Sequence, residues 1–165
     1  MPALHTYDVD VVWLGARGVG TVGYTSYGRE NELRAAGRPP LPGTSDPAFR
    51  GDPARWSPED LLVGALAECH MLWLLHLAAE AGVIVVGYTD RASGTMRIEA
   101  AGHGQFREVV LRPQVTVDPT TPAADGRPVD DALLAELHER AHEHCFIARS
   151  VNFPVHLRPG PLAVA

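Results

Sequence analysis

One long apolar segment, residues 58–82, restricts the folds open to this chain more than any other feature of its sequence. Ser57 can cap a helix at its start, Pro58 suits the first helical position, and Gly82 can end the helix. Between these signals, apolar residues fall on almost every side of the helix. A helix with that pattern is buried on most sides. The sequence therefore predicts a central helix against which the other elements pack.

The remaining elements are shorter and mostly extended. A second helix is predicted over residues 129–144, where leucine and alanine repeat at helical spacing along one face. Pro113 lies inside one of the predicted strands and indicates an edge or a bulge. Strands, helix, strands, helix and a final strand give an α+β protein, which we expect to form one domain over residues 1–165. The predicted strands are residues 5–14, 22–27, 83–88, 92–99, 105–117 and 150–157.

The N-terminal third combines a hairpin with a long irregular segment. Residues 5–27 are expected to form the hairpin, because Gly15, Gly18 and Gly20 separate two apolar runs. Residues 29–56 are rich in proline, glycine and charge, and they are predicted to form one long loop. Loops of this length inside a compact domain are usually functional. We therefore expect functional residues in this loop.

Composition and charge exclude several classes of protein. With 45% apolar and 21% charged residues, the chain of 165 residues is typical of an ordinary soluble globular protein. Its net charge of -6 and its pI near 5.7 argue against nucleic-acid binding. The N-terminus lacks the pattern of a signal peptide, and the apolar runs are too interrupted to span a bilayer. We therefore expect a cytoplasmic protein with no nucleic-acid or membrane partner, whose cysteines are kept reduced.

Two cysteines, Cys69 and Cys145, are candidates for redox chemistry. Cys69 lies in the middle of the central helix, and Cys145 lies at the end of the second helix. They are 76 residues apart, so they form no CxxC motif, and the spacing leaves open whether the two sulfurs meet. The alternative is a pair of buried thiols that never react. A reactive cysteine would have to be ionised, because the thiolate is the nucleophile.

Charged residues that could stabilise a thiolate stand just before Cys69. A nearby arginine favours the thiolate and the negative charge that develops on a departing oxygen, and a carboxylate can orient its guanidinium. The candidates are Arg50, Arg55 and Glu59. Glu59 precedes Cys69 by ten residues on the same predicted helix, about 15 Å along its axis, so a loop residue would have to lie between them. Each arginine could equally be a solvated surface charge.

The second predicted helix carries an HExxH motif, from His138 to His142. In zinc proteases the two histidines bind the metal and the glutamate, here Glu139, acts as general base. Arg140 would place a cation between the two ligands, and few third ligands follow His142 in the sequence. A polar, solvent-facing side of the helix is the alternative to a zinc hydrolase.

Two segments resemble the OsmC/Ohr family, which is named for osmotically inducible protein C and organic hydroperoxide resistance protein. The first runs from Trp56 to Cys69 and combines a Pro-Glu-x-Leu start, a run of small residues and a cysteine ten residues after the glutamate. The second covers residues 141–150, where Cys145 is followed by a serine and then by a predicted last strand. The two motifs stand in the family's order, and the resemblance covers nearly the whole chain.

The resemblance implies an OsmC-like fold, in which strongly curved antiparallel sheets surround two long helices and two chains intertwine as a homodimer. It also implies a thiol peroxidase that reduces organic hydroperoxides or hydrogen peroxide. Cys69 matches the peroxidatic cysteine, Cys145 the resolving cysteine and Glu59 the active-site glutamate. Arg50 is the best match to the family's arginine, and Arg29 is the second choice. The resemblance implies no cofactor, and an external dithiol or lipoyl-type reductant would restore the thiols.

The chain departs from the better-known family members after both cysteines. His70 follows Cys69 where other members often have an apolar residue, and the segment after Cys145 lacks their proline. These departures indicate a divergent OsmC-like branch. They leave open a non-catalytic OsmC-like protein that binds a small molecule.

Overall fold

The computed structural model describes residues 3–118, 120 and 122–165. Its two α-helices and its strands confirm the predicted α+β class. The chain divides into two compact units, residues 1–61 and 62–165. The first three strands form a sheet of their own, and β3 is further bridged to Trp56 within the same N-terminal unit. The elements in chain order are β1 (Asp10–Trp13), β2 (Asn31–Arg34), β3 (Leu41–Gly43), η1 (Pro47–Phe49), α1 (Pro58–Glu80), β4 (Val85–Asp90), β5 (Ser93–Ile98), β6 (Gly104–Leu111), β7 (Pro113–Val117), α2 (Asp131–His144), η2 (Ala148–Ser150), β8 (Val155–Leu157) and β9 (Ala163–Val164).

The first unit is built on an antiparallel sheet of order β1-β2-β3. Trp13 pairs with Asn31 and Asp10 with Arg34, so β1 runs against β2. The hairpin predicted over residues 5–27 is therefore wrong in its return strand, because residues 22–27 form turns and bends. Alternating apolar residues show that a segment can be a strand, but they do not select its partner.

The long excursion between β1 and β2 is closed at its base by backbone contacts. The Gly28 N–H donates to the Gly15 carbonyl at 2.8 Å, and Trp13 Nε1 donates to the Gly28 carbonyl at 2.9 Å. A β-carbon on Gly15 would collide with the Gly28 carbonyl. Only glycine allows the two backbones to approach this closely.

The segment predicted as one loop, residues 29–56, contains regular structure. It includes β2, β3 and the short helix η1. Asp46 caps η1, since its carboxylate accepts a hydrogen bond from the Ala48 N–H at 2.6 Å. Arg50 then ends η1 in a left-handed conformation, with φ of 71°. The segment is thus largely held by local hydrogen bonds and sheet pairing.

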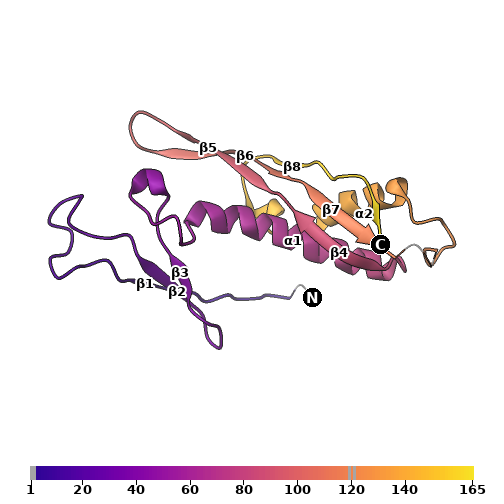
Figure 1. Cartoon of the computed structure of the whole chain (residues 1–165), viewed down its shortest axis with the longest axis horizontal. Helices are drawn as coiled ribbons and strands as arrows, with labels where there is room; N and C mark the ends of the chain where they lie inside the picture. The colour runs from indigo at the N-terminus through magenta and orange to yellow at the C-terminus, as the bar shows by residue number, and fades with distance from the viewer. Residues whose placement is uncertain (1–2, 119, 121) are drawn as a thin grey trace. The chain divides into compact units, whose positions relative to one another are not determined.

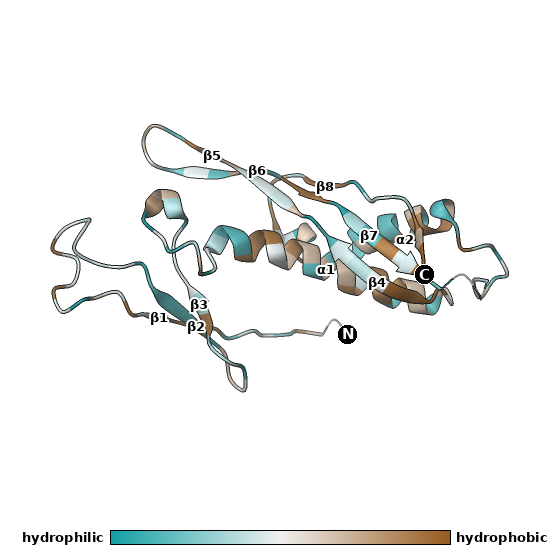
Figure 2. Cartoon of the chain, in the orientation of Figure 1, coloured by the Kyte–Doolittle hydropathy of each residue, from teal (hydrophilic) through white to brown (hydrophobic). Residues whose placement is uncertain are grey.

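Helix α1 confirms the predicted central helix. Ser57 Oγ accepts from the Asp60 N–H at 3.1 Å, and Asp60 Oδ2 accepts from the Ser57 N–H at 3.0 Å, which is a reciprocal capping box. Gly82 takes a φ of 71° directly after the helix, as a glycine stop does. Apolar colouring covers most of α1 (Figure 2).

The apolar surface of α1 exceeds what the chain covers. By length and composition alone the helix is long and apolar enough to cross a membrane, with 23 residues and a mean hydropathy of 1.6, a test that the core helix of a soluble protein also passes. Only 28% of that apolar window is buried. The buried residues are Leu66, His70, Leu74, Leu77 and Ala78.

The second unit contains two sheets, of order β4-β7-β9 and β5-β6-β8 (Figure 1). Each joins an antiparallel pair to a parallel strand, β8 beside β6 and β9 beside β7, so these sheets are mixed where the resemblance implied antiparallel ones. The strand predicted at 105–117 is two strands, because β6 ends at Leu111 and β7 begins at Pro113 in the other sheet. Proline lacks the N–H that would continue a ladder, so the chain changes sheets at this point.

The core lies between the helices and the two sheets of the second unit. Asp130 caps α2, since its carboxylate accepts from the Leu133 N–H at 2.9 Å, and the helix confirms the one predicted over residues 129–144. A smaller cluster joins Leu66 of α1 to Val109 and Leu111 of β6. The larger cluster contains Leu74, Leu77, Ala78, Val83, Val115, Val117, Ala123, Leu133, Leu134, Leu137 and Ala141. These contacts fix α1 against α2, which positions the side chains described next.

Candidate active site

The two cysteines meet in the second unit. Cys69 comes from the middle of α1 and is partly buried. Cys145 ends α2 and is only 1% exposed. Both are free thiols, and Cys69 is close enough to Cys145 to contribute to the raised pKa of the Cys145 thiol. The fold therefore creates the contact that the sequence spacing left open.

Cys145 is held as a protonated thiol. Burial is the main cause that raises the pKa of the Cys145 thiol to about 11, and the neighbouring Cys69 side chain adds to the shift. The Ala148 N–H donates to Cys145 Sγ at 3.4 Å and acts in the opposite direction. A protonated Cys145 can donate its S–H to the Cys69 sulfur and so stabilise negative charge there. This arrangement suits a pair in which Cys69 reacts first and Cys145 second.

An aromatic cluster lies one helical turn from Cys69. Trp73 follows Cys69 by four residues, so both side chains lie on the same side of α1. The Trp73 ring packs against Phe146, with 5.4 Å between centroids, and against His144, with 5.0 Å. Phe146 is 65% exposed although it follows the buried Cys145. The surface near the sulfurs therefore offers aromatic faces to an apolar molecule.

The first unit contains a hollow of about 360 Å³ whose lining includes both Arg29 and Glu59. Glu59 Oε2 is buried and has no hydrogen-bond partner among the described residues. The Arg29 guanidinium lies over two rings, with its Cζ 4.5 Å from the centroid of Tyr24 and 4.0 Å from that of Tyr27. Its Nη1 donates to the carbonyls of the same two tyrosines, at 3.1 and 2.7 Å. The hollow thus combines a firmly held cation with an unsatisfied carboxylate.

The other candidate arginines lie differently. Arg50 is not among the residues that line this hollow, and its Cζ lies 6.0 Å from the centroid of the Tyr24 ring. Arg55 is ion-paired with Asp52 at 3.6 Å. Of the two arginines expected from the sequence, the second choice, Arg29, shares a hollow with Glu59, and the first choice, Arg50, does not.

The first histidine of the HExxH motif pairs with a residue on the other helix. His138 Nδ1 lies 3.0 Å from His70 Nε2, and the two rings stack 5.3 Å apart. Both histidines are almost fully buried, and burial is the main cause that lowers the pKa of His70 to about 3 and that of His138 to about 4. The pair is therefore neutral at neutral pH. Glu139 is exposed, on a different side of α2 from the buried His138.

This histidine pair escaped the sequence reasoning. The one available signal was a histidine at a position facing the core on each predicted helix, which does not identify the partner. Among the residues that the structure describes, His, Cys, Asp and Glu side chains form no group of three or more that could hold a metal ion. In this structure the motif contributes a polar contact between α1 and α2.

Comparison with known proteins places this geometry in a family. The model of the OsmC-like protein family matches residues 51–159. No curated protein sequence gives a significant match. The matched segment contains Glu59, both cysteines and the histidine pair.

Solved structures show the same fold. An OsmC-like protein of unknown function from Vibrio cholerae is 28% identical with a TM-score of 0.82, over 95% of this chain and 100% of that one. An organic hydroperoxide resistance protein OsmC from Legionella pneumophila is 16% identical with a TM-score of 0.66, over 99% of both chains. The organic hydroperoxide resistance protein OhrB of Bacillus subtilis is 20% identical with a TM-score of 0.60, over 96% of this chain and 100% of that one. The last two likenesses show the fold alone. Because the family model matches more than half of the chain, this protein belongs to the OsmC-like protein family, at a distance from its organic hydroperoxide resistance members.

Proposed function

We propose that this protein is a thiol peroxidase in which Cys69 reduces an organic hydroperoxide and Cys145 resolves the product as a disulfide. The proximity of the two thiols carries the proposal, because a resolving cysteine must reach the sulfur that has reacted. Membership of a family whose structures include organic hydroperoxide resistance proteins supports the class of substrate.

The proposed cycle needs only the two thiols, a peroxide and a reductant. The Cys69 thiolate attacks the nearer peroxide oxygen, so that an S–O bond forms while the O–O bond breaks, and the alkoxide takes up a proton and leaves as an alcohol. The resulting Cys69 sulfenic acid condenses with the Cys145 thiol, which forms the disulfide and releases water. An external dithiol, such as a lipoyl-type reductant, then restores both thiols by exchange and becomes a disulfide itself.

We assign Arg29 and Glu59 to the stabilisation of charge in this reaction. A guanidinium favours the thiolate and the negative charge on the departing oxygen. Glu59 has an unsatisfied oxygen in the hollow that Arg29 also lines, which supports Arg29 as the working arginine. Arg50, the better sequence match, is the alternative.

The exposed aromatic surface supports an organic peroxide over hydrogen peroxide. Trp73 and Phe146 present aromatic faces near the sulfurs, and burial of apolar area favours binding by roughly 25 cal/mol per Å². Hydrogen peroxide has no apolar part that could use this surface. We therefore expect alkyl or aryl hydroperoxides to be the better substrates.

We further propose that the working form is a homodimer in the cytoplasm. In the first unit, Tyr7, Val11, Trp13, Val22 and Tyr24 are all at least 45% exposed. Among the residues that the structure describes, the apolar residues of the buried core all belong to the second unit. A unit without an apolar core of its own needs a further chain to cover its exposed apolar residues, and so does the uncovered apolar surface of α1. A second copy fits this need and agrees with the family resemblance.

A thiol count tests the chemistry. The reduced protein should show two free thiols. After one equivalent of cumene hydroperoxide it should show none, and mass spectrometry should find a Cys69–Cys145 linkage. Cys69→Ser should abolish peroxide consumption. Cys145→Ser should still consume one equivalent and accumulate a sulfenic acid that dimedone traps on Cys69. Thiols that remain free in the wild type would contradict the proposal and favour a non-catalytic binding protein.

A matched pair of variants tests the arginine. Arg29→Gln and Arg50→Gln each remove one cation from the first unit. We expect Arg29→Gln to slow sulfenic acid formation by about 100-fold or more, the scale of losing one charged transition-state contact, and Arg50→Gln to change it less than threefold. The reverse order would return the role to Arg50. Rates of sulfenic acid formation that equal the wild-type rate in both variants would exclude both arginines from the proposed mechanism.

A further inference from the structure

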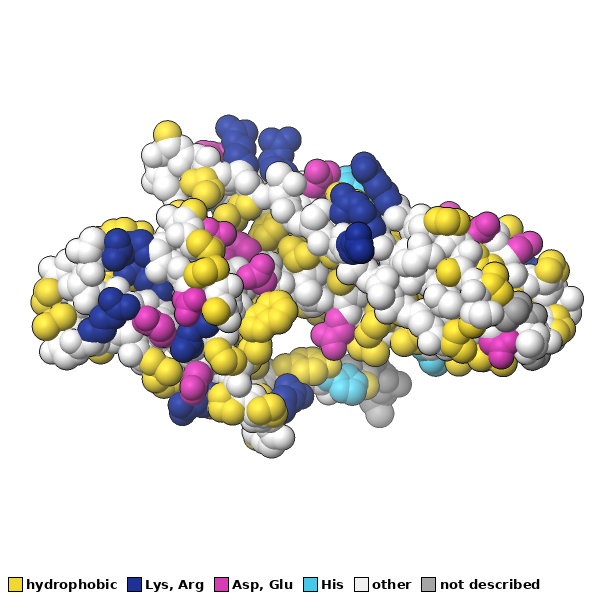
Figure 3. Space-filling view, in the orientation of Figure 1, with side chains coloured by type: hydrophobic (Ala, Val, Ile, Leu, Met, Phe, Trp, Pro, Cys, Tyr) yellow, Lys and Arg dark blue, Asp and Glu magenta, His cyan; other side chains and the backbone are white. Residues whose placement is uncertain are grey.

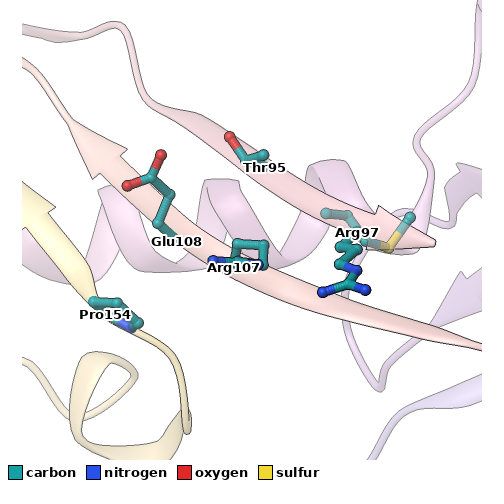
Figure 4. Close-up of a pocket in the computed structure, with 6 residues that line it drawn as sticks. Thr95, Arg97, Arg107, Glu108 and Pro154 are labelled. Atoms are coloured by element: carbon teal, nitrogen blue, oxygen red, sulfur yellow. The ribbon is translucent and has the colours of Figure 1, made fainter. Parts of the chain in front are cut away.

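A hollow of about 520 Å³ lies on the sheet β5-β6-β8, formed by residues that the proposed peroxidase chemistry does not use. Figure 4 shows its lining: Thr95 and Arg97 come from β5, Arg107 and Glu108 from β6, and Pro154 from the segment before β8. The space-filling view shows basic side chains gathered over these strands (Figure 3). They stand out because the whole chain carries a net charge of -6.

A β-bulge explains why the charged side chains share one hollow. In the pairing of β5 with β6, Thr95 is opposite Glu108 while Met96 is opposite Phe106, so Arg107 is the extra residue. A bulge sets two residues of one strand against one of its neighbour and re-aims a side chain. Arg107 is exposed and Glu108 half-buried, and both line the same hollow as Thr95. The irregular step thereby brings Arg107 into the hollow that Arg97 also lines.

The inner face of the same strands fixes this arrangement. Phe106, the neighbour of Arg107, stacks on Phe153 with 5.4 Å between centroids and packs against the core cluster around Leu66. A β-carbon on Gly94 would collide with Phe106, so β5 and β6 are closely fitted there. With Phe106 held in the core, the strands have little freedom to slip and move the bulge.

The two arginines have no counter-charge within the described residues. Neither Arg97 nor Arg107 forms an ion pair or a side-chain hydrogen bond there, whereas Arg17, Arg34 and Arg127 each pair with a carboxylate at 2.7 to 3.0 Å. The acidic residue of the hollow is itself engaged, since Glu108 Oε2 lies 3.4 Å from His156 Nε2. The hollow therefore offers two guanidinium groups to an external anion, with the Thr95 hydroxyl as a further donor.

We propose that this hollow binds the phosphate group of a small soluble molecule through Arg97 and Arg107. Guanidinium groups bind phosphate oxygens with two parallel hydrogen bonds each, and two cations match a doubly charged phosphate. The open face of a sheet leaves room for the rest of the ligand along the strands. Phosphate binding here is a separate property from the thiol chemistry, so each can fail without the other.

Binding of inorganic pyrophosphate to the full chain tests the proposal. Isothermal titration should give saturable binding, and NMR should show the Thr95 amide among those that shift. Arg97→Gln and Arg107→Gln should each weaken binding by about tenfold, the scale of one charge-assisted contact. The control Arg38→Gln removes an exposed cation from the first unit and should leave affinity unchanged. Circular dichroism and thermal unfolding establish that each variant is folded.

Three results would overturn the proposal. The first is no saturable binding of pyrophosphate by the wild type. The second is affinity that falls as much in Arg38→Gln as in the two hollow variants, which would indicate only a general loss of charge. The third is co-sedimentation with vesicles of anionic phospholipid when pyrophosphate neither binds nor competes, which would make the surface a membrane contact.

Discussion

The burial of Cys145 makes a quantitative prediction about its reactivity. Alkylating reagents attack the thiolate, so the rate follows the ionised fraction. The pKa of the Cys145 thiol is raised from 9.0 to about 11, which is two pH units. At pH 8 the ionised fraction is therefore about 100-fold lower than for an unburied cysteine. The buried sulfur is also shielded from the reagent, which slows the reaction further.

A Cys69→Ser variant isolates this effect. Cys145 is then the only thiol, and the serine hydroxyl remains beside it. Mass spectrometry can follow alkylation by iodoacetamide at pH 8 in the folded protein and in denaturant. Burial, the larger cause of the raised pKa, remains in this variant, so we expect the folded rate to be more than about tenfold lower than the unfolded rate and to rise with pH beyond 9. A folded rate within tenfold of the unfolded rate would refute the reasoning from burial, and the Cys145→Ser variant reports Cys69 alone for comparison.

Three further predictions concern stability. In the unfolded chain, His70 and His138 become protonated below their ordinary pKa near 6.5, whereas the folded pair stays neutral down to about pH 4. As the pH falls through this window, the free energy of unfolding should therefore decrease by up to about 1.4 kcal/mol per histidine per pH unit. Urea unfolding at pH 7 and pH 5 measures this, and a double His70→Gln, His138→Gln variant should flatten the dependence. Ser57→Ala removes the helix cap and should cost about 1 kcal/mol in chemical denaturation, and a free energy of unfolding equal to that of the wild type would contradict this. Gly94→Ala should cost about 1–3 kcal/mol because its β-carbon meets Phe106, and a thermal midpoint equal to the wild type's would contradict the close fit.

The helices could be predicted because their signals are local. The Ser57 cap, the Gly82 stop and the cap at Asp130 all lie within a few residues of the ends that they define. Hydrogen bonds inside a helix join residues four apart, so a short window of sequence contains the cause. Both predicted helices therefore agree with the structure within a few residues.

The strands were harder because pairing depends on distant residues. Val22–Tyr27 alternates well enough for a strand, yet β1 pairs with Asn31–Arg34. The contact of Gly15 with Gly28 that closes the intervening segment has no signature in either neighbourhood. The break at Arg112 was likewise hidden, because Pro113 is compatible with an edge, a bulge or a change of sheet.

The candidate site likewise combines features that the sequence predicts with features that depend on tertiary packing. Cys69 and Glu59 share one helix, and their spacing follows from the sequence. The contact between Cys69 and Cys145 depends on the packing of α1 against α2, so residue types alone could not establish it. The environment of Arg29 depends on Tyr24 and Tyr27, whose carbonyls and rings hold it only after the turn between β1 and β2 has formed.

The packing of α1 against α2 links the thiols to the histidine pair. Cys69 and His70 are neighbours on α1, and their partners Cys145 and His138 lie seven residues apart, which is two turns and therefore one side of α2. A rotation of α1 that broke the buried histidine hydrogen bond would also draw the sulfurs apart. Leaving His70 Nε2 or His138 Nδ1 unpaired in the core would cost about 1–3 kcal/mol, so the histidine pair opposes that rotation. The residue that departs from the better-known family pattern, His70, thereby supports the thiol contact on which the proposed chemistry depends.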